Sequence, residues 1–324
     1  MMKRLIAIAL SGLLASIAAA RADEYPNKPI TMIVPFAAGG PTDVLARIFA
    51  ERMRQSLGQM VLVENVTGAA GSIAVGRVVR SAPDGYTVSI GHWSTHVING
   101  AIYNLPYDLR TDLAPVSLLT SNPQLIVAKN DLAATDLKSL VVWLKANPGK
   151  ALLGTAGQGS ASHIAGVYFA QASDTKVQFV PYRGTGPAMQ GLVAGQLDLI
   201  FDQASNSLPQ VRAKTIKALA VTAKTRLASA PDIPTVDEAG MPGFYISVWN
   251  GLWVPKGTPQ PVIAKLAKAV RDTFADETVR KRLIELGQDL PTLDQQTPEA
   301  LGALQKAEVE KWWPIVKAAN IKVE

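Results

Sequence analysis

VPFAAGGP (Val34–Pro41) and VPYRGTGP (Val180–Pro187) are two stretches of this 324-residue chain that share one pattern. In each, an apolar run ends in a glycine-containing loop, and a proline then opens an amphipathic run. Glycine permits a sharp turn, and proline is favoured in the first turn of a helix. The repetition predicts two similar α/β lobes whose loops face one another. A chance match is the alternative, because glycine and proline are common at strand–helix turns.

Short apolar runs alternate with amphipathic runs through most of the chain. This alternation predicts an α/β fold, with parallel strands and helices on both faces of the sheet. The predicted strands are Ile30–Phe36, Val61–Glu64, Thr87–Gly91, Leu125–Ala128, Ala151–Gly154, Val177–Pro181, Leu197–Phe201 and Ile216–Thr222, with an extended segment at Phe244–Pro255. The predicted helices are Thr42–Leu57, Ser72–Arg80, Leu137–Asn147, Ser162–Ala172, Pro187–Ala194, Gln260–Phe274, Glu277–Leu286 and Pro298–Ala319, the last kinked or interrupted by Pro314.

The N-terminus is typical of an export signal. Lys3 and Arg4 precede an apolar run, Leu5–Ala20, and small residues follow up to Ala22. Cleavage after Ala22 would also remove Arg21, leaving 29 basic and 26 acidic residues, a net charge of +3. The alternative is a membrane anchor, but the run is shorter than the roughly 20 residues that span a bilayer. We expect a soluble periplasmic protein.

The composition excludes several functional classes. The chain has no cysteine, which excludes disulfides, thiolate metal sites, iron–sulfur clusters and a cysteine nucleophile. The small net charge and the absence of a basic block argue against a nucleic-acid partner. With 48% hydrophobic residues the chain can form the cores of two domains or one large one.

The loop Ala37–Asp43 is a candidate anion site. Pro41 presets the first helical turn and leaves the amides of Thr42 and Asp43 without helical partners. A helix N-terminus carries about half a positive charge, so it can hold an anion without lysine or arginine. The alternative is a plain turn capped by Thr42.

A second candidate loop, Thr155–His163, adds hydroxyl and amide side chains among its glycines. Ligand binding, helix capping and catalysis by a Ser160–His163 pair are three open interpretations. Ser162 stands where a dinucleotide-binding loop has its third glycine, the chain has no GxxxxGK[ST] sequence, and no G-x-S-x-G elbow surrounds either serine. We therefore favour binding over catalysis.

Four further segments follow predicted strands. Val66–Ser72 is a glycine-containing loop. His92–His96 offers Trp93 as a wall and Ser94 or Thr95 as donors, whereas a metal site on its two histidines lacks the carboxylate of an H-E-x-x-H motif. Tyr182-Arg183 supplies a cation, which is alternatively a surface or lobe-bridging arginine. Asp202 is placed to orient a loop or to bind an amino or hydroxyl group. Ligands of open α/β sheets bind beyond the carboxyl ends of the strands, so these loops predict a cleft.

The sequence resembles the Bug (TctC-type) family, the periplasmic solute receptors of tripartite tricarboxylate transporters, from about Tyr25 to the C-terminus. The matching segments are VPFAAGGPTDVLAR (Val34–Arg47), ENVTGAAGSIA (Glu64–Ala74), PDGYT (Pro83–Thr87), GTAGQGSASH (Gly154–His163), VPYRGTGPAMQGLVAGQLDLIFD (Val180–Asp202) and IPTVDEAGMPGF (Ile233–Phe244). Val66-Thr67-Gly68, where family members usually have proline before the glycine, and His92-Trp93 depart from the family pattern. These departures concern the identity of the ligand, not the fold.

The resemblance implies a two-lobed periplasmic-binding-protein fold (type II-like), with a parallel-rich mixed sheet in each lobe. Two interlobe crossings are expected near Ser121–Gln124 and Tyr245–Trp249. Residues 1–22 would be the signal peptide, 23–122 plus 247–324 lobe 1, and 123–246 lobe 2. In the family, backbone amides, hydroxyls and ordered water hold a ligand carboxylate. By motif match this role falls on Phe36–Thr42 and Thr155–Ser162.

The sequence thus predicts a monomeric receptor, not an enzyme, that needs no cofactor or metal. It would bind a small organic carboxylate or dicarboxylate and deliver it to the membrane components of a tripartite tricarboxylate-type transporter. Trp93 and Trp249 would flank an aromatic ring if the ligand has one. A sensor signalling to a membrane kinase and a periplasmic serine hydrolase are the alternatives. The candidate ligand-binding residues are Phe36, Ala37, Ala38, Gly39, Gly40, Thr42, Ala69, Trp93, Ser94, Thr95, Thr155, Gln158, Gly159, Ser160, Ser162, His163, Tyr182, Arg183 and Asp202.

Overall fold

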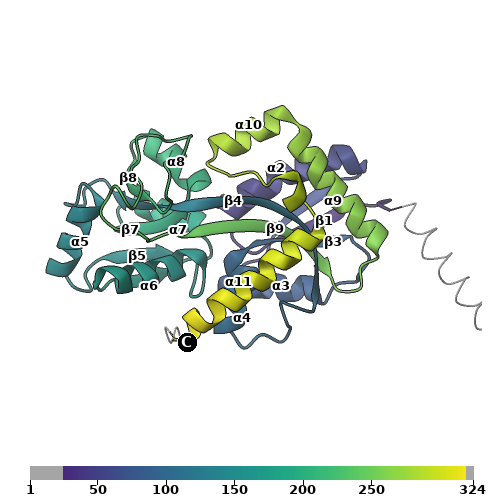
Figure 1. The fold of residues 1–324 in the computed structure, drawn as a ribbon, viewed down its shortest axis with the longest axis horizontal. Helices are drawn as coiled ribbons and strands as arrows, with labels where there is room; N and C mark the ends of the chain where they lie inside the picture. The colour runs from purple at the N-terminus through teal and green to yellow at the C-terminus, as the bar shows by residue number, and fades with distance from the viewer. Residues whose placement is uncertain (1–24, 319–324) are drawn as a thin grey trace, which may run out of the picture.

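The computed structural model describes residues 25–318, and the signal peptide predicted for residues 1–22 lies outside them. The chain folds into two α/β lobes joined by two long strands (Figure 1). The strands are β1 (Ile30–Val34), β2 (Val61–Asn65), β3 (Thr87–His92), β4 (Leu113–Lys129), β5 (Leu152–Thr155), β6 (Gln178–Pro181), β7 (Leu199–Gln203), β8 (Ile216–Val221) and β9 (Ser247–Pro255).

Helices connect these strands in the order expected for α/β units. They are α2 (Pro41–Leu57), α3 (Ser72–Val79), α4 (Asn99–Ile102), α5 (Leu137–Ala146), α6 (Ala161–Ser173), α7 (Thr185–Val193), α8 (Ala204–Arg212), α9 (Gln260–Ala275), α10 (Glu277–Glu285) and α11 (Pro298–Ala318). Short helical turns are η1 (Ala69–Gly71), η2 (Ser94–Ile98) and η3 (Leu293–Gln295). The predicted alternation of strands and helices is confirmed.

Each lobe contains parallel strands together with antiparallel ones. In the first lobe β1 pairs in parallel with β2 and β3, and β9 joins β3 antiparallel. In the second lobe β5 pairs in parallel with β6 and β7, while β4 runs antiparallel to β7 and β8. The predicted mixed sheet in each lobe is therefore confirmed, although parallel and antiparallel pairings are equally frequent, since β4 also pairs antiparallel with β9 in the first lobe.

Strand β4 belongs to both lobes. Its first part pairs antiparallel with β9, and its last residues, Gln124–Ala128, pair with β7 (Figure 1). The pairing with β9 ends at Pro123 and Ser247, where both strands pass from one lobe to the other. The two predicted crossings lie at this point, and the boundaries of the lobes stay a prediction.

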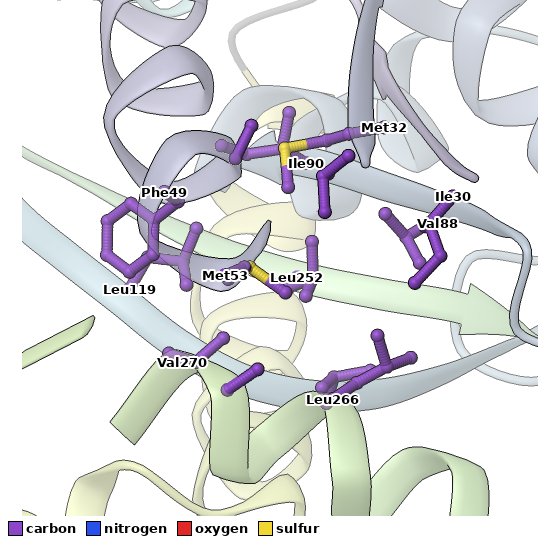
Figure 2. Close-up of a cluster of buried hydrophobic side chains, with 14 of the residues drawn as sticks. Ile30, Met32, Phe49, Met53, Val88, Ile90, Leu119, Leu252, Leu266 and Val270 are labelled. Atoms are coloured by element: carbon purple, nitrogen blue, oxygen red, sulfur yellow. The ribbon is translucent and has the colours of Figure 1, made fainter. Parts of the chain in front are cut away.

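Hydrophobic clusters cover both faces of each sheet. In the first lobe Ile30, Met32 and Val34 of β1 face α2 and α9, whereas Ile33 faces α3 and α11. Successive strand residues point to opposite faces, so an apolar run such as β1 contributes to two cores. Figure 2 shows the cluster beneath α2 and α9, with the labelled residues Ile30, Met32, Phe49, Met53, Val88, Ile90, Leu119, Leu252, Leu266 and Val270.

Several features differ from the expectations. Helix α11 continues through Pro314, so of the two outcomes expected there the interruption is wrong and the kink stays a prediction. Proline has no N–H, so the carbonyl of Glu310, four residues earlier, loses its hydrogen bond within the helix. Because Glu310 is exposed, water can donate a hydrogen bond to that carbonyl instead. The short helical segments Ser94–Ile102 and Ala204–Arg212 were not predicted, and β4 begins at Leu113 rather than Leu125.

Candidate ligand-binding site

A small cavity of about 20 Å³, room for about one water molecule, lies between the two lobes, at the carboxyl ends of the parallel strands. The first lobe lines it with Phe36, Gly40, Pro41, Thr42 and His92, and β4 contributes Gln124 at the crossing. The second lobe lines it with Ala156, Ser160, Ala161, Ser162, Thr185, Phe201, Asp202 and Gln203. The cavity is therefore in the cleft that the loop positions predicted.

Four helices begin at this cavity. Lining residues occupy the N-cap or first turn of α2, α6, α7 and α8: Gly40 and Thr42, Ser160 and Ser162, Thr185, and Gln203. Each helix N-terminus presents unpaired N–H groups and a partial positive charge. Four converging N-termini from both lobes provide main-chain donors and partial positive charge without a lysine or arginine in the lining, and the carboxyl group of Asp202 lies on the same wall as three of them.

The loop of the first lobe is held by Asp43, a buried residue of α2. Its carboxylate accepts hydrogen bonds from the Gly39 amide at 2.9 Å, from Asn65 at 3.0 Å and from Arg47 at 3.0 Å. Asn65 also donates to the Phe36 carbonyl at 2.9 Å. Burial alone would raise the pKa of Asp43, but these hydrogen bonds and the Arg47 charge lower it overall. The Gly39 amide is thus used inside the loop, and the exposed Ala38 does not line the cavity.

The loop of the second lobe is held by its own side chains. Ser160 caps α6 by accepting from the His163 amide at 3.3 Å, and Ser162 Oγ accepts from the Ala156 amide at 2.9 Å. His163 Nδ1 accepts from the Gly159 amide at 3.1 Å. Burial lowers the pKa of His163 to about 4, so the ring is neutral at pH 7. Ser160 is therefore the N-cap of α6, and ligand binding by this loop stays a prediction.

The geometry does not assemble a nucleophile and base. In the described part of the chain Ser160 Oγ bonds to Ser162 Oγ at 3.0 Å and to the His163 main chain, with no bond to the His163 ring. The Thr155 hydroxyl accepts from the Gly157 amide at 3.3 Å, and the Gln158 carbonyl accepts from Tyr103 of the first lobe. These contacts shape the loop and do not activate a serine.

The two similar loops of the sequence meet across the cleft. The Ala37 amide donates to the Arg183 carbonyl at 3.1 Å. A Cβ atom on Gly186 would lie 2.8 Å from the Gly40 nitrogen, so the two glycines are in backbone contact. The predicted face-to-face arrangement of these loops is confirmed. Ala37, Ala69, Tyr182 and Arg183 line an adjoining open part of the cleft, where Arg183 is exposed.

His92, not Trp93, lines the cavity. The His92 ring stacks on Phe36 with centroids 5.1 Å apart, and its Nδ1 accepts from the Ser94 amide at 3.2 Å. The Trp93 ring is buried in the core against Trp312, so the expectation of Trp93 as a cleft wall is wrong for this structure. Strand β3 ends at His92 and Trp93 already has helical backbone angles, so the two side chains leave the chain in different directions.

Other predicted residues also lie behind the cavity wall. Trp249 packs in the same core as Trp93. Ser94 and Thr95 are fully buried, and Thr95 Oγ1 donates to the His92 carbonyl at 3.0 Å. They orient His92 and do not line the cavity, which corrects their expected role as donors to the ligand.

Asp202 lines the cavity floor and is 1% exposed. Its Oδ2 accepts from Asn206 at 2.7 Å and from Ser207 at 2.8 Å. Burial raises the pKa of Asp202 to about 6 against the lowering effect of its hydrogen-bonding neighbours.

Sequence reasoning missed the lining residues Gln124, Thr185, Phe201 and Gln203. Gln203 and Phe201 could have been found, because they stand beside Asp202 at the end of a predicted strand.

A family model described as "Tripartite tricarboxylate transporter family receptor" matches residues 45–321. This chain belongs to that family. A protein of Agrobacterium vitis, named for the TAR-I ttuE-ttuC' intergenic region, is 40% identical over 320 residues, which cover 99% of this chain and 92% of the relative. The family assignment made from the sequence motifs is confirmed.

Solved structures of receptors have the same fold. The periplasmic binding protein BugD superposes with a TM-score of 0.89 at 40% identity, covering 93% of this chain and all of BugD. MatC of Rhodopseudomonas palustris with bound malate has a TM-score of 0.87 at 38% identity, covering 90% and 100%. Another R. palustris protein, with adipate, has a TM-score of 0.88 at 30% identity, covering 92% and 99%.

Two searches of residues 25–318 gave negative results. No group of three or more histidine, aspartate or glutamate side chains in this range is arranged to hold a metal ion. Among the described helices, none combines the length and the apolar character that a membrane span requires.

Proposed function

We propose that this receptor captures a small organic carboxylate in the cavity between its lobes and delivers it to the membrane components of a tripartite tricarboxylate-type transporter. The observation that carries the proposal is the convergence of the α2, α6, α7 and α8 N-termini on one buried cavity. Relatives of the same fold hold malate and adipate, both dicarboxylates, which supports the same ligand class here.

Main-chain amides are sufficient to hold such an anion. The amides of Thr42 and Asp43 open α2, and those of Ala161 and Ser162 open α6, on opposite sides of the cavity. Each hydrogen bond to a charged group contributes about 1.5–3 kcal/mol. A ligand that bonds to both lobes stabilises the closed arrangement over an open one, so binding and closure are coupled.

A panel of mono- and dicarboxylates tests this function by thermal shift and isothermal titration calorimetry. A ligand present at 100 times its Kd should stabilise the fold by about 2.7 kcal/mol. The matched control is the neutral diamide of the best dicarboxylate, which has the same shape but no charge and should bind at least 100-fold more weakly. Equal binding of acid and diamide, or binding of neutral sugars alone, would contradict the proposal.

Delivery to a transporter requires a separate experiment. Cells that lack this receptor should lose uptake of the labelled ligand at micromolar concentration, and the wild-type gene should restore it. Uptake that is unchanged, together with loss of a transcriptional response to the ligand, would instead favour a sensory role. Export through the N-terminal signal and a periplasmic location belong to the same proposal, and they predict the receptor in the periplasmic fraction.

Catalysis is not part of the proposal. The Ser160 hydroxyl caps α6, and His163 Nδ1 is occupied by the Gly159 amide, so neither group is poised for hydrolysis. We expect no turnover of carboxylic esters by the purified protein.

A further inference from the structure

Two buried oxygen atoms of the cavity lining have no hydrogen-bond partner in the described part of the chain. They are Asp202 Oδ1 and Gln124 Oε1. Asp202 is 1% exposed and Gln124 is 2% exposed, and both line the same cavity between the lobes. Buried polar atoms in native proteins nearly always have a partner, so two such atoms in one cavity require an explanation.

The surroundings hold both residues in place. Asn206 and Ser207 bond to Asp202 Oδ2, which leaves Oδ1 as the unoccupied oxygen. The main chain of Gln124 is fixed by Thr222, whose hydroxyl accepts from the Gln124 amide at 2.9 Å and whose amide donates to the Gln124 carbonyl at 2.8 Å. The Thr185 side chain and the Gln203 amide also lie near enough to Asp202 to lower its pKa, but neither forms a hydrogen bond to Oδ1 in this arrangement.

An unsubstituted carboxylate ligand cannot satisfy these atoms. An ionised carboxyl group only accepts hydrogen bonds, and both orphan atoms are acceptors as well. The missing partner must therefore donate an O–H or N–H. A site built to bond such a group rejects an analogue that lacks it, because its own buried acceptor is then left unpaired.

We propose that the ligand of this receptor carries a hydroxyl or amino group on its carbon chain in addition to its carboxylate, and that Asp202 and Gln124 accept the hydrogen of that group. This inference rests on the proposed carboxylate-binding function and narrows the ligand class. The helix N-termini bind the acid group, and the two acceptors bind the substituent.

The opposite wall of the cavity has the complementary character. His92 Nδ1 accepts from the Ser94 amide, which places the proton of the neutral ring on Nε2. Burial lowers the pKa of His92 to about 4, so the ring stays neutral at pH 7. His92 and the amides of α2 thus donate from the first lobe, while Asp202 accepts from the second lobe and Gln124 accepts from the crossing strand. This division of donors and acceptors suits a ligand with both kinds of group.

Matched ligand series test the inference by calorimetry. The series are succinate, malate and aspartate; glutarate, 2-hydroxyglutarate and glutamate; and adipate, 2-hydroxyadipate and 2-aminoadipate. At the chain length that binds best, the hydroxy or amino member should bind at least 10-fold more tightly than the unsubstituted acid. Whether the hydroxy or the amino member binds most tightly shows whether the donor is a hydroxyl or an ammonium group.

Three results would overturn the inference in different ways. Equal or tighter binding of the unsubstituted acid removes it and leaves the carboxylate receptor intact, with water as the partner of the two oxygens. The same holds if none of the nine compounds binds but another carboxylate without a donor substituent does. If no carboxylate binds at all, the proposed function and the inference fail together.

Substitutions provide a second readout. Gln124→Met and Asp202→Asn should each reduce the preference for the substituted ligand to about 3-fold or less. The control is Gln296→Met, since Gln296 Oε1 is also buried and unpartnered but does not line the cavity. This variant should keep the wild-type preference. Wild-type preference in both cavity variants, each confirmed as folded by circular dichroism, would overturn the assignment of Asp202 and Gln124.

Discussion

The two anion-binding loops, Phe36–Thr42 in the first lobe and Thr155–Ser162 in the second, reach similar ends by different means. The first has no polar side chain before Thr42 and takes its support from the Asp43 carboxylate of the following helix. The second carries three hydroxyl side chains, of Thr155, Ser160 and Ser162, and each of them accepts a main-chain N–H of the same loop or its helix.

This difference shows which groups remain available to a ligand. In both loops the polar side chains support the main chain, and the amides of the first helical turn are the groups left over. The hydroxyls of the second loop resemble ligand donors in the sequence, but in the structure most of their bonding capacity is spent locally. Specificity must therefore come from elsewhere in the cavity, and the amides supply a general preference for anions.

Of the substitutions considered, Gly186→Ala should cause the largest change, and it should act on ligand affinity. A Cβ atom there would lie 2.8 Å from the Gly40 nitrogen and 3.0 Å from the Gly39 carbonyl carbon, across the closed cleft. We expect ligand affinity to fall about 10- to 100-fold, equivalent to about 1.4–3 kcal/mol of overpacking. The melting temperature of the unliganded protein should hardly change, because opening the lobes relieves the clash. Calorimetry and thermal melts measure both quantities.

Gly40→Ala is the control for this prediction. Its Cβ atom would lie 3.4 Å from the Gly186 nitrogen, which is ordinary van der Waals contact, so affinity should change less than 3-fold. A larger loss in Gly40→Ala than in Gly186→Ala would show that the structure misplaces the contact between the two loops.

Asp43→Ala should be the next largest change, and it acts on stability. The substitution leaves the Gly39 amide and the Asn65 side chain without their acceptor and loosens the first loop. We expect a loss of about 2 kcal/mol in the free energy of unfolding at pH 7, measured in urea. The folded-state pKa of Asp43 is lowered, so its contribution is present above the ordinary pKa of 3.8 and is lost as the pH falls below it. The difference between wild type and variant should accordingly shrink in acid.

Arg47→Ala provides the matched control for Asp43. The Arg47 side chain is 56% exposed and forms an i,i+4 pair with Asp43, and such exposed pairs contribute little. We expect a loss below about 1 kcal/mol. If both substitutions lower the free energy of unfolding equally, Asp43 would stabilise the protein through its ion pair with Arg47 and not through its hydrogen bonds to the loop.

The order of elements could be predicted from sequence because apolar runs and helical periodicity are strong here. The start of β4 was missed because Pro115 and Ser117 interrupt the apolar run, and the structure has an irregular register there. Helix α8 was missed because Pro209 lies inside a polar stretch, although tertiary packing of Ala204 and Leu208 stabilises it. Packing against the rest of the lobe overrides local propensity in such segments.

The site was predicted less completely than the fold. Main-chain loops follow from glycine and proline spacing, so Gly40, Thr42 and Ser160 were placed correctly at the cavity. The direction of a side chain at a strand end depends on the register, which the sequence does not specify. This is why Trp93 was expected in the cleft and His92 occupies it. Gln124 lies on the crossing strand, and its role depends on a contact between lobes.

Ser160→Ala should have a smaller effect, confined to the second loop. Loss of an N-cap side chain typically costs about 1 kcal/mol, and Ser160 is the N-cap of α6. We expect this loss in urea unfolding, with no esterase activity before or after the change. Ser160→Thr keeps the capping oxygen and should retain most of the stability. Detectable ester hydrolysis by the wild type that disappears in Ser160→Ala would restore the enzyme alternative.

Arg183→Ala should have the smallest effect, because the loop contact uses the carbonyl of this residue and not its side chain. A guanidinium that bonded a ligand carboxylate would contribute about 1.5–3 kcal/mol, so its loss would weaken binding at least 10-fold. The guanidinium is exposed at the open part of the cleft, where it can attract an anion without holding it. We therefore expect the affinity of the variant to differ from that of wild type by less than 3-fold. At low salt the variant should bind its ligand more slowly than wild type. This difference in association rate should vanish at about 0.5 M salt, where exposed charges are screened within a few ångströms. Stopped-flow tryptophan fluorescence measures the affinity and the association rate. A 10-fold loss of affinity that does not depend on salt would show that the Arg183 side chain contacts the ligand, and the main-chain amides alone would then not explain binding.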